Sequence, residues 1–148
     1  MRRSQEGFTL TELVVAMAIL ALATAAVLPY GRQSSEARQF TELSQRTAAL
    51  LREARIGALS RQRETAVEID LKARRIRLGT REIAMPDTVD ATLRTARGDV
   101  SPEGAVFRFF ADGSATGGTV RFTRGGDVKV IAIHWLTGAV TLEAGAVP

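Results

Sequence analysis

Apolar residues are concentrated in one stretch near the start of the chain, whereas later segments alternate between apolar and polar positions. Residues 13–28 are apolar apart from Thr24, and Glu12 is the only charged residue between Phe8 and Leu28. A stretch of this length is close to what a helix needs to cross the hydrocarbon core of a membrane. A helix that is apolar all round has no side that prefers water. We therefore expect residues 8–29 to form a transmembrane helix, surrounded by lipid or by similar helices.

Helical spacing continues beyond Pro29, but only one face of the segment is apolar. Apolar or small residues recur at intervals of three and four between Ala37 and Ala58, which predicts an amphipathic helix over residues 30–60. Pro29 should bend the helix rather than end it, because helix-forming residues resume shortly afterwards. The pattern thus predicts one helix from about Phe8 to about Ser60.

From Glu64 onward the apolar positions recur every second residue, which is typical of strands. A hairpin is predicted from Thr65–Asp70 and Arg75–Leu78, with inward-facing side chains at Val67, Ile69, Ile76 and Leu78. Further strands are expected at residues 89–95, 105–110, 119–123, 128–135 and 139–142, with turns that contain glycine between most of them. The predicted fold class is α+β, with a long N-terminal helix packed on antiparallel β-sheets and residues 61–148 as a β-rich domain.

The residues before the apolar stretch indicate how the chain is oriented and processed. Arg2 and Arg3 precede the stretch, and Gly7 stands at its border. Basic residues favour the cytoplasmic side, so residues 30–148 should be exported. A secretory signal peptide cut near residues 23–25 is the alternative, but a signal peptide needs neither a glycine at the border nor an acid inside the stretch.

Glu12 needs a partner, because a lone carboxylate at the centre of a membrane helix costs about 2.5–3.5 kcal/mol, and less near its end. Cleavage after Gly7 would give Phe8 a free amino group. On a neighbouring subunit, this amino group would neutralise Glu12 in a medium of low dielectric constant. We therefore assign Glu12 to subunit assembly.

Two segments resemble known families. Gly7-Phe8-Thr9-Leu10-Thr11-Glu12 is similar to the prepilin peptidase motif of type IV pilins and type II secretion pseudopilins. Residues 106–122, with the glycine-rich turn and strand that follow, resemble the C-terminal half of the GspH/FimT family of minor pseudopilins and minor pilins. The first resemblance implies that residues 1–7 are a leader removed by a prepilin peptidase, that Phe8 is then N-methylated, and that Glu12 directs assembly.

The second resemblance implies a minor pseudopilin of the type II secretion system. Such a protein crosses the inner membrane once, with its N-terminus in the cytoplasm and its C-terminal domain in the periplasm, and joins the tip of a pseudopilus that drives protein export. The implied partners are the prepilin peptidase, other major and minor pseudopilins, the inner-membrane secretion platform and membrane lipid. The alternative is a FimT-like minor type IV pilin that binds DNA in natural transformation.

Candidate catalytic and metal-binding residues are few. The chain has no cysteine, which excludes disulfides and thiolate metal sites. Ser114 lacks the G-x-S-x-G spacing of a hydrolase nucleophile, and the only histidine, His134, is expected in a strand beside Trp135. A single histidine does not make an ordinary zinc site, and the acids are too scattered for calcium. We therefore expect no enzymatic activity, no metal and no cofactor.

The net charge of +4 is too small to indicate nucleic-acid binding by itself. Arginines on several predicted strands could nevertheless form a basic strip that contacts phosphates. These are Arg74, Arg75, Arg77, Arg108, Arg121 and Arg124. Arginines also occur on ordinary solvated faces of antiparallel sheets, and aromatic residues for base stacking are few. We therefore expect no nucleic-acid partner.

Overall fold

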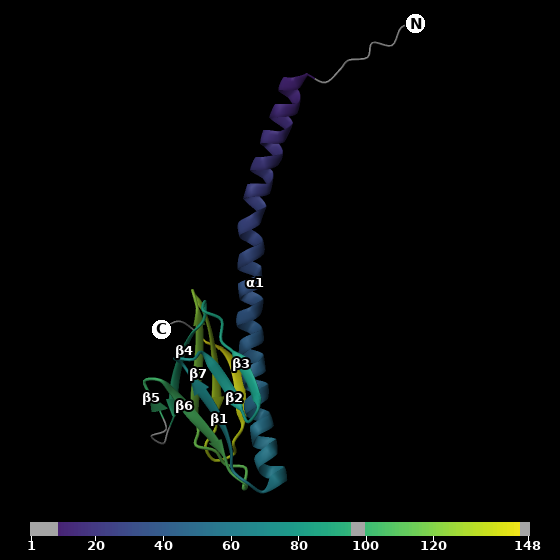
Figure 1. Cartoon of the computed structure of the whole chain (residues 1–148). Coiled ribbons are helices and arrows are strands. Elements are labelled where there is room, and N and C mark those ends of the chain that lie inside the picture. Colours follow the sequence, from purple (N-terminus) through teal and green to yellow (C-terminus); the bar gives the residue numbers. More distant parts are fainter. Residues whose placement is uncertain (1–8, 96–99, 146–148) are drawn as a thin grey trace. The chain divides into compact units, whose positions relative to one another are not determined.

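The computed structural model describes residues 9–95 and 100–145, without the side chains of residues 24–34 and Val100. Contacts within the chain define two units, Met1–Ala37 and Arg38–Pro148, and we describe each by itself. Helix α1 (Leu10–Arg61) has 52 residues and contributes to both units (Figure 1). The prediction of one long helix is thus confirmed for the described residues, whereas Phe8 lies outside them. The bend expected at Pro29 stays a prediction.

The second unit contains two antiparallel sheets (Figure 1). The first sheet has five strands in the order β3-β2-β1-β6-β5: β1 (Thr65–Asp70), β2 (Arg75–Leu78), β3 (Arg81–Ala84), β5 (Val100–Ser101) and β6 (Gly104–Phe109). The second sheet has four strands in the order β4-β7-β8-β9: β4 (Asp90–Thr95), β7 (Gly118–Arg124), β8 (Asp127–Ile133) and β9 (Val140–Gly145). This arrangement confirms the predicted α+β class.

One hydrophobic core joins both sheets and the part of α1 that belongs to the second unit. The predicted inward positions Val67, Ile69 and Ile76 are fully buried, and Leu78 is partly buried against them. The other large contributions come from Phe107, Phe109, Val120, Phe122, Ile131 and, on the helix, Leu43, Leu51 and Ala54. Because alternate residues of a strand point to opposite faces, the period of two in the sequence correctly identifies this core.

The buried face of α1 also carries two hydroxyl groups. Ser44 and Thr47 are fully buried. The Ser44 hydroxyl donates to the Phe40 carbonyl at 2.8 Å, and the Thr47 hydroxyl donates to the Leu43 carbonyl at 2.7 Å. Each polar group is therefore satisfied by its own helix, and these small side chains fit into the core without an unpaired hydroxyl.

The helix ends in a defined cap rather than by fraying. Gln62 adopts a left-handed conformation with φ of 50°, and the Arg63 amide donates to the Ala58 carbonyl at 3.2 Å. This hydrogen bond belongs to the Schellman motif, which turns the chain out of the helix axis. It leads directly into β1.

Two sequence predictions for the strands are wrong. Strand β8 ends at Ile133, so His134 and Trp135 lie in the following loop and not in the strand. Two hydrogen bonds close that loop: the His134 amide donates to the Ala139 carbonyl at 2.9 Å, and the Gly138 amide donates to the His134 carbonyl at 2.8 Å. Strand β7 begins at Gly118, one residue before the predicted strand at residues 119–123, and ends one residue after it, at Arg124. Strands β3 and β5 were not predicted.

Candidate functional site

The predicted assembly residue Glu12 lies in the first turn of α1. Thr9 directly precedes this helix, and its hydroxyl oxygen accepts a hydrogen bond from the Glu12 amide at 3.3 Å. The Thr9 carbonyl also accepts from the amides of Glu12 and Leu13, at 3.1 and 3.3 Å. Thr9 is therefore the N-cap of the helix. The negative charge of Glu12 at the third helical position also suits the positive end of the helix dipole.

This geometry gives Glu12 a local role that the pattern of apolar residues did not reveal. The spacing Thr9-x-x-Glu12 matches a capping box, and this signal could have identified Thr9 from the sequence. Gly7 and Phe8, the predicted cleavage and methylation positions, lie outside the described residues. The assignment of all three residues to processing and assembly stays a prediction.

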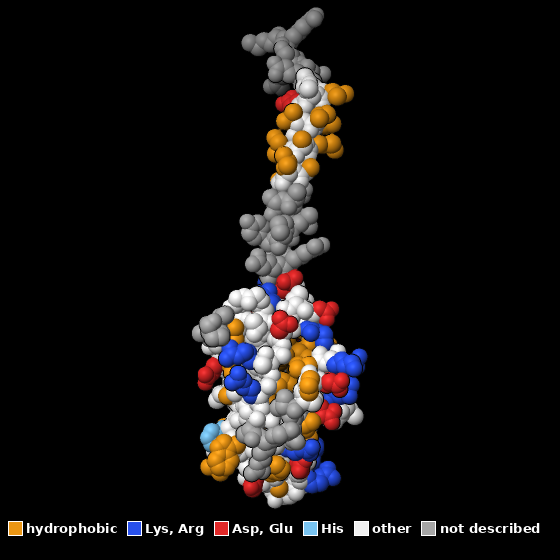
Figure 2. Space-filling model, turned by 90° about the vertical axis from the view of Figure 1, so that its left-hand side faces the viewer, with side chains coloured by type: hydrophobic (Ala, Val, Ile, Leu, Met, Phe, Trp, Pro, Cys, Tyr) orange, Lys and Arg blue, Asp and Glu red, His pale blue; other side chains and the backbone are white. Residues whose placement is uncertain are grey.

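The helical segment from Leu10 to Leu22, which contains Glu12, exposes its large apolar side chains. Leu10 is 82% exposed and Leu22 is 72% exposed, and six other large apolar side chains between them are more than half exposed. They are Leu13, Val14, Val15, Met17, Ile19 and Leu20. Figure 2 shows them as a dense group along this part of the helix. Contiguous apolar surface of this kind marks contact with other proteins or with lipid.

Among the residues that the structure describes, no helix is both long and apolar enough to cross a membrane. The predicted transmembrane segment 8–29 extends into residues whose side chains lie outside the described part of the chain.

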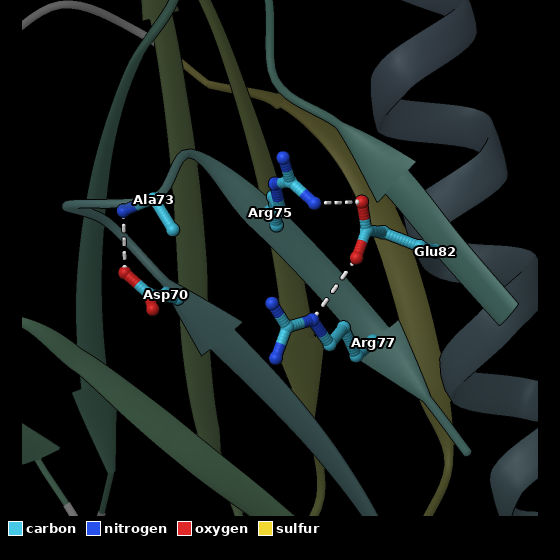
Figure 3. A network of polar contacts seen from close by, with 5 residues as sticks. All are labelled: Asp70, Ala73, Arg75, Arg77 and Glu82. Atoms are coloured by element: carbon cyan, nitrogen blue, oxygen red, sulfur yellow. Dashed lines mark hydrogen bonds and ion pairs between the residues drawn. The ribbon is translucent and has the colours of Figure 1, made fainter. Parts of the chain in front are cut away.

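On the first sheet, acids accompany the arginines that were considered for nucleic-acid binding. Strands β2 and β3 pair Arg77 directly opposite Glu82. The Glu82 carboxylate accepts from Arg75 at 2.8 Å and from Arg77 at 3.0 Å (Figure 3). Arg108 on β6 forms an ion pair with Glu64 at 2.6 Å. Two carboxylates thus compensate part of the charge of these three arginines, which weakens their attraction for phosphates.

The remaining arginines of the hypothetical strip lie elsewhere. Arg74 occupies the turn before β2. Its guanidinium donates to the Val89 carbonyl at 2.6 Å and also contacts the Pro86 carbonyl, so it holds the segment that connects β3 of the first sheet to β4 of the second. Arg124 pairs with Asp127 at 2.8 Å. Only Arg121 lines an open groove, of about 470 Å3, on the second sheet, together with Arg94 and three threonines. The six arginines therefore do not form one continuous basic strip.

Ser114 and His134 are not joined into a catalytic arrangement. The Ser114 hydroxyl donates to Asp112 at 2.6 Å, and the Nδ1 atom of His134 lies 3.2 Å from the Thr137 hydroxyl. Within the described residues, no hydrogen bond links Ser114 to His134, and no group of three potential metal ligands occurs.

A long N-terminal helix packed on antiparallel sheets, with an acid in its first turn, is a pilin-like fold. In agreement, the profile of the prokaryotic N-terminal methylation motif matches residues 2–28. The profile described as type II transport protein GspH matches residues 43–137, from the buried face of α1 to the loop after β8. The chain belongs to this GspH family.

Solved structures of minor pilins and pseudopilins share the fold. The type IV minor pilin FimU of Pseudomonas aeruginosa superimposes with a TM-score of 0.58 at 20% sequence identity, covering 74% of this chain and 95% of FimU. The minor pseudopilin EpsH from the type 2 secretion system of Vibrio cholerae gives a TM-score of 0.55 at 15% identity, covering 68% of this chain and 93% of EpsH. No protein with a curated description matches the chain.

Proposed function

We propose that the chain is a minor pseudopilin of a type II secretion system, which is incorporated into the tip of a periplasmic pseudopilus and supports protein export. The observation that carries the proposal is the combination of the GspH domain with the methylation motif at the start of the same chain. Its role is mechanical, and its partners are the prepilin peptidase, other pseudopilins, the secretion platform of the inner membrane and lipid.

The exposed apolar segment of α1 would provide the contacts between subunits. After cleavage following Gly7, the Phe8 amino group of one subunit would face the Glu12 carboxylate of its neighbour. In apolar surroundings this attraction acts over short distances and is only weakly screened. It would therefore fix the axial register of the stacked helices, while the apolar side chains supply most of the buried area.

The structure suggests a variant that separates assembly from helix capping. Glu12→Gln removes the charge but keeps a side-chain oxygen that can accept a hydrogen bond at the helix start. Thr9→Ala removes the capping hydroxyl and keeps the charge. We expect Glu12→Gln to reduce crosslinking to partner pseudopilins and secretion in cells by about tenfold, the effect of losing roughly 1.4 kcal/mol of attraction, whereas Thr9→Ala should assemble normally.

Leader removal must be followed in the same cells by N-terminal sequencing, because both positions lie close to Gly7. Gly7→Val is the matched control for processing, and it should leave the leader attached. Normal crosslinking and secretion by a correctly processed Glu12→Gln variant would refute the assembly role of Glu12. Mature protein that begins at a residue other than Phe8 would refute the processing.

A minor pilin of a type IV pilus is the second candidate, favoured by the similarity to the fold of FimU. If it bound DNA, the groove with Arg94 and Arg121 would be the place, because these arginines make no ion pair within the described residues. Joint replacement of Arg94 and Arg121 by Gln should then abolish salt-dependent duplex binding. Replacement of Arg75 and Arg77, both paired with Glu82, is the control. Under our proposal, the unaltered protein shows no such binding.

A further inference from the structure

A surface pocket of about 400 Å3 lies between the loop from β6 to β7 and the loop from β8 to β9. Phe110, Trp135 and Leu136 give it apolar walls, and Asp112 supplies a carboxylate. Trp135 and Leu136 are each 59% exposed. Exposed large apolar side chains beside polar groups are typical of interaction sites, and tryptophan is prominent among the residues that dominate binding energy.

The loops hold Trp135 in a fixed position. The Ala115 amide donates to the Trp135 carbonyl at 2.8 Å. At Gly117, where φ is +71°, a Cβ atom would lie 2.7 Å from the Cβ of Trp135, so only glycine allows the two loops to approach this closely. The His134 ring stacks on the indole with centroids 6.4 Å apart and planes at 14°. Because the backbone of Trp135 is held in this way and its side chain has only two rotatable bonds, ordering the indole on binding costs little conformational entropy.

The carboxylate of Asp112 is only partly used within the protein. Its Oδ1 atom accepts from the Ser114 amide at 2.9 Å and from the Ser114 hydroxyl at 2.6 Å. These hydrogen bonds, the hydroxyl first, lower the pKa of Asp112, so the group carries its charge at neutral pH. Both hydrogen bonds from Ser114 go to the Oδ1 atom, and within the described part of the chain Asp112 forms no ion pair. It remains available to a ligand.

A carboxylate, an indole face and apolar walls within one pocket suit a basic side chain. The carboxylate can accept charge-assisted hydrogen bonds from a guanidinium, the indole attracts a cation to its face, and the aliphatic stem packs on apolar groups. We propose that this pocket receives an arginine side chain of a neighbouring protein subunit. That this neighbour belongs to the same filament rests on the proposed function, whereas the recognition of arginine rests on the pocket alone.

The test uses the full chain in detergent micelles. Trp135 is the only tryptophan, so its fluorescence reports on this pocket. The probe is acetyl-glycyl-arginyl-glycine amide, and the matched peptide carries citrulline, which has nearly the same shape but no charge. We expect a saturable change with the arginine peptide at a dissociation constant on the order of 1 mM, and at least about fivefold weaker binding of the citrulline peptide.

Asp112→Asn keeps an oxygen that can accept both hydrogen bonds from Ser114 but removes the charge, and it should weaken binding of the arginine peptide about fivefold or more. Asp127→Asn makes the same change at the first residue of β8 and should leave binding unchanged. Equal binding of both peptides, unchanged binding by Asp112→Asn, or no saturable response up to about 20 mM peptide would each overturn the proposal. None of these measurements involves Glu12 or another subunit, so they succeed or fail independently of the proposed function.

Discussion

Phe40 joins helix α1 to the second sheet, and its replacement tests how the helix is held. Its side chain is 2% exposed. The Arg124 guanidinium carbon lies 5.8 Å from the centre of the ring, and the Lys129 ammonium nitrogen lies 5.7 Å from it. These cations come from β7 and β8, so one aromatic ring on the helix contacts two adjacent strands.

The expected loss of stability follows from the burial and from the two cations. Truncation of a buried phenylalanine to alanine costs about 3–5 kcal/mol through lost burial and the cavity that remains. Leucine fills much of this volume but removes the aromatic face, and each cation contributes about 0.5–1 kcal/mol to that face. We therefore expect Phe40→Ala to lower the free energy of unfolding by about 3–5 kcal/mol and Phe40→Leu by about 1–3 kcal/mol.

Denaturant unfolding of the full chain in micelles, followed by circular dichroism, would give these free energies. A double-mutant cycle of Phe40→Leu with Lys129→Met isolates the interaction with the cation, and it removes the separate effect of the hydrogen bond from Lys129 to the Thr41 hydroxyl at 3.2 Å. The expected coupling is about 0.5–1 kcal/mol. A coupling of zero would refute the cation–π contribution. A loss below about 1 kcal/mol for Phe40→Ala would refute the place of Phe40 in the core.

Two other predictions concern a close contact between two strands and the stability of the fold in acid. Gly118→Ala should lower the free energy of unfolding by about 2 kcal/mol or more. The reason is that φ of Gly118 is +137° and a Cβ atom there would lie 2.2 Å from the Arg94 carbonyl oxygen. An unchanged melting temperature would contradict this prediction. The Ser114 hydrogen bonds lower the folded-state pKa of Asp112, so its contribution is complete above the unfolded pKa of about 3.9 and disappears as pH falls through the folded value. The difference in melting temperature between the native chain and Asp112→Asn should therefore be constant from about pH 7 to 5 and vanish in stronger acid; a difference that grows with acidity would contradict the assignment.

The sequence was most informative where the spacing of apolar residues alone decides the structure. It predicted the long helix and the strands whose alternate residues are buried. Strand β3 was not predicted because its sequence Arg-Glu-Ile-Ala has only one partly buried apolar residue, Ile83. The strand is held by its pairing with β2 and by the ion pair between Arg81 and Glu53 on α1. Strand β8 was predicted too long because its apolar residues continue into the loop at Trp135.

Charge compensation could not be predicted because it depends on strand register. The basic strip was a reasonable hypothesis from the spacing of arginines, but Glu82 reaches Arg75 and Arg77 only through the hairpin of β2 and β3. Arg108 meets Glu64 across a separation of 44 residues. The pocket with Asp112 and Trp135 likewise requires two loops that are distant in the sequence. The role of Thr9, by contrast, was already present in the local spacing to Glu12.

The order in which the chain visits its sheets has a consequence for how the domain folds. The first sheet receives β1, β2 and β3, the second receives β4, and the chain then returns for β5 and β6 before β7, β8 and β9 complete the second sheet. Strand β4 has no hydrogen-bonded partner until β7 has formed, and β1, which pairs with β2 on one edge, gains its second partner only when β6 has formed. Long closures of this kind slow folding. A chain interrupted before Gly118 holds all five strands of the first sheet but only β4 of the second. It should therefore not retain the shared core, and it would expose the unpaired β4 and the uncovered face of the first sheet to aggregation.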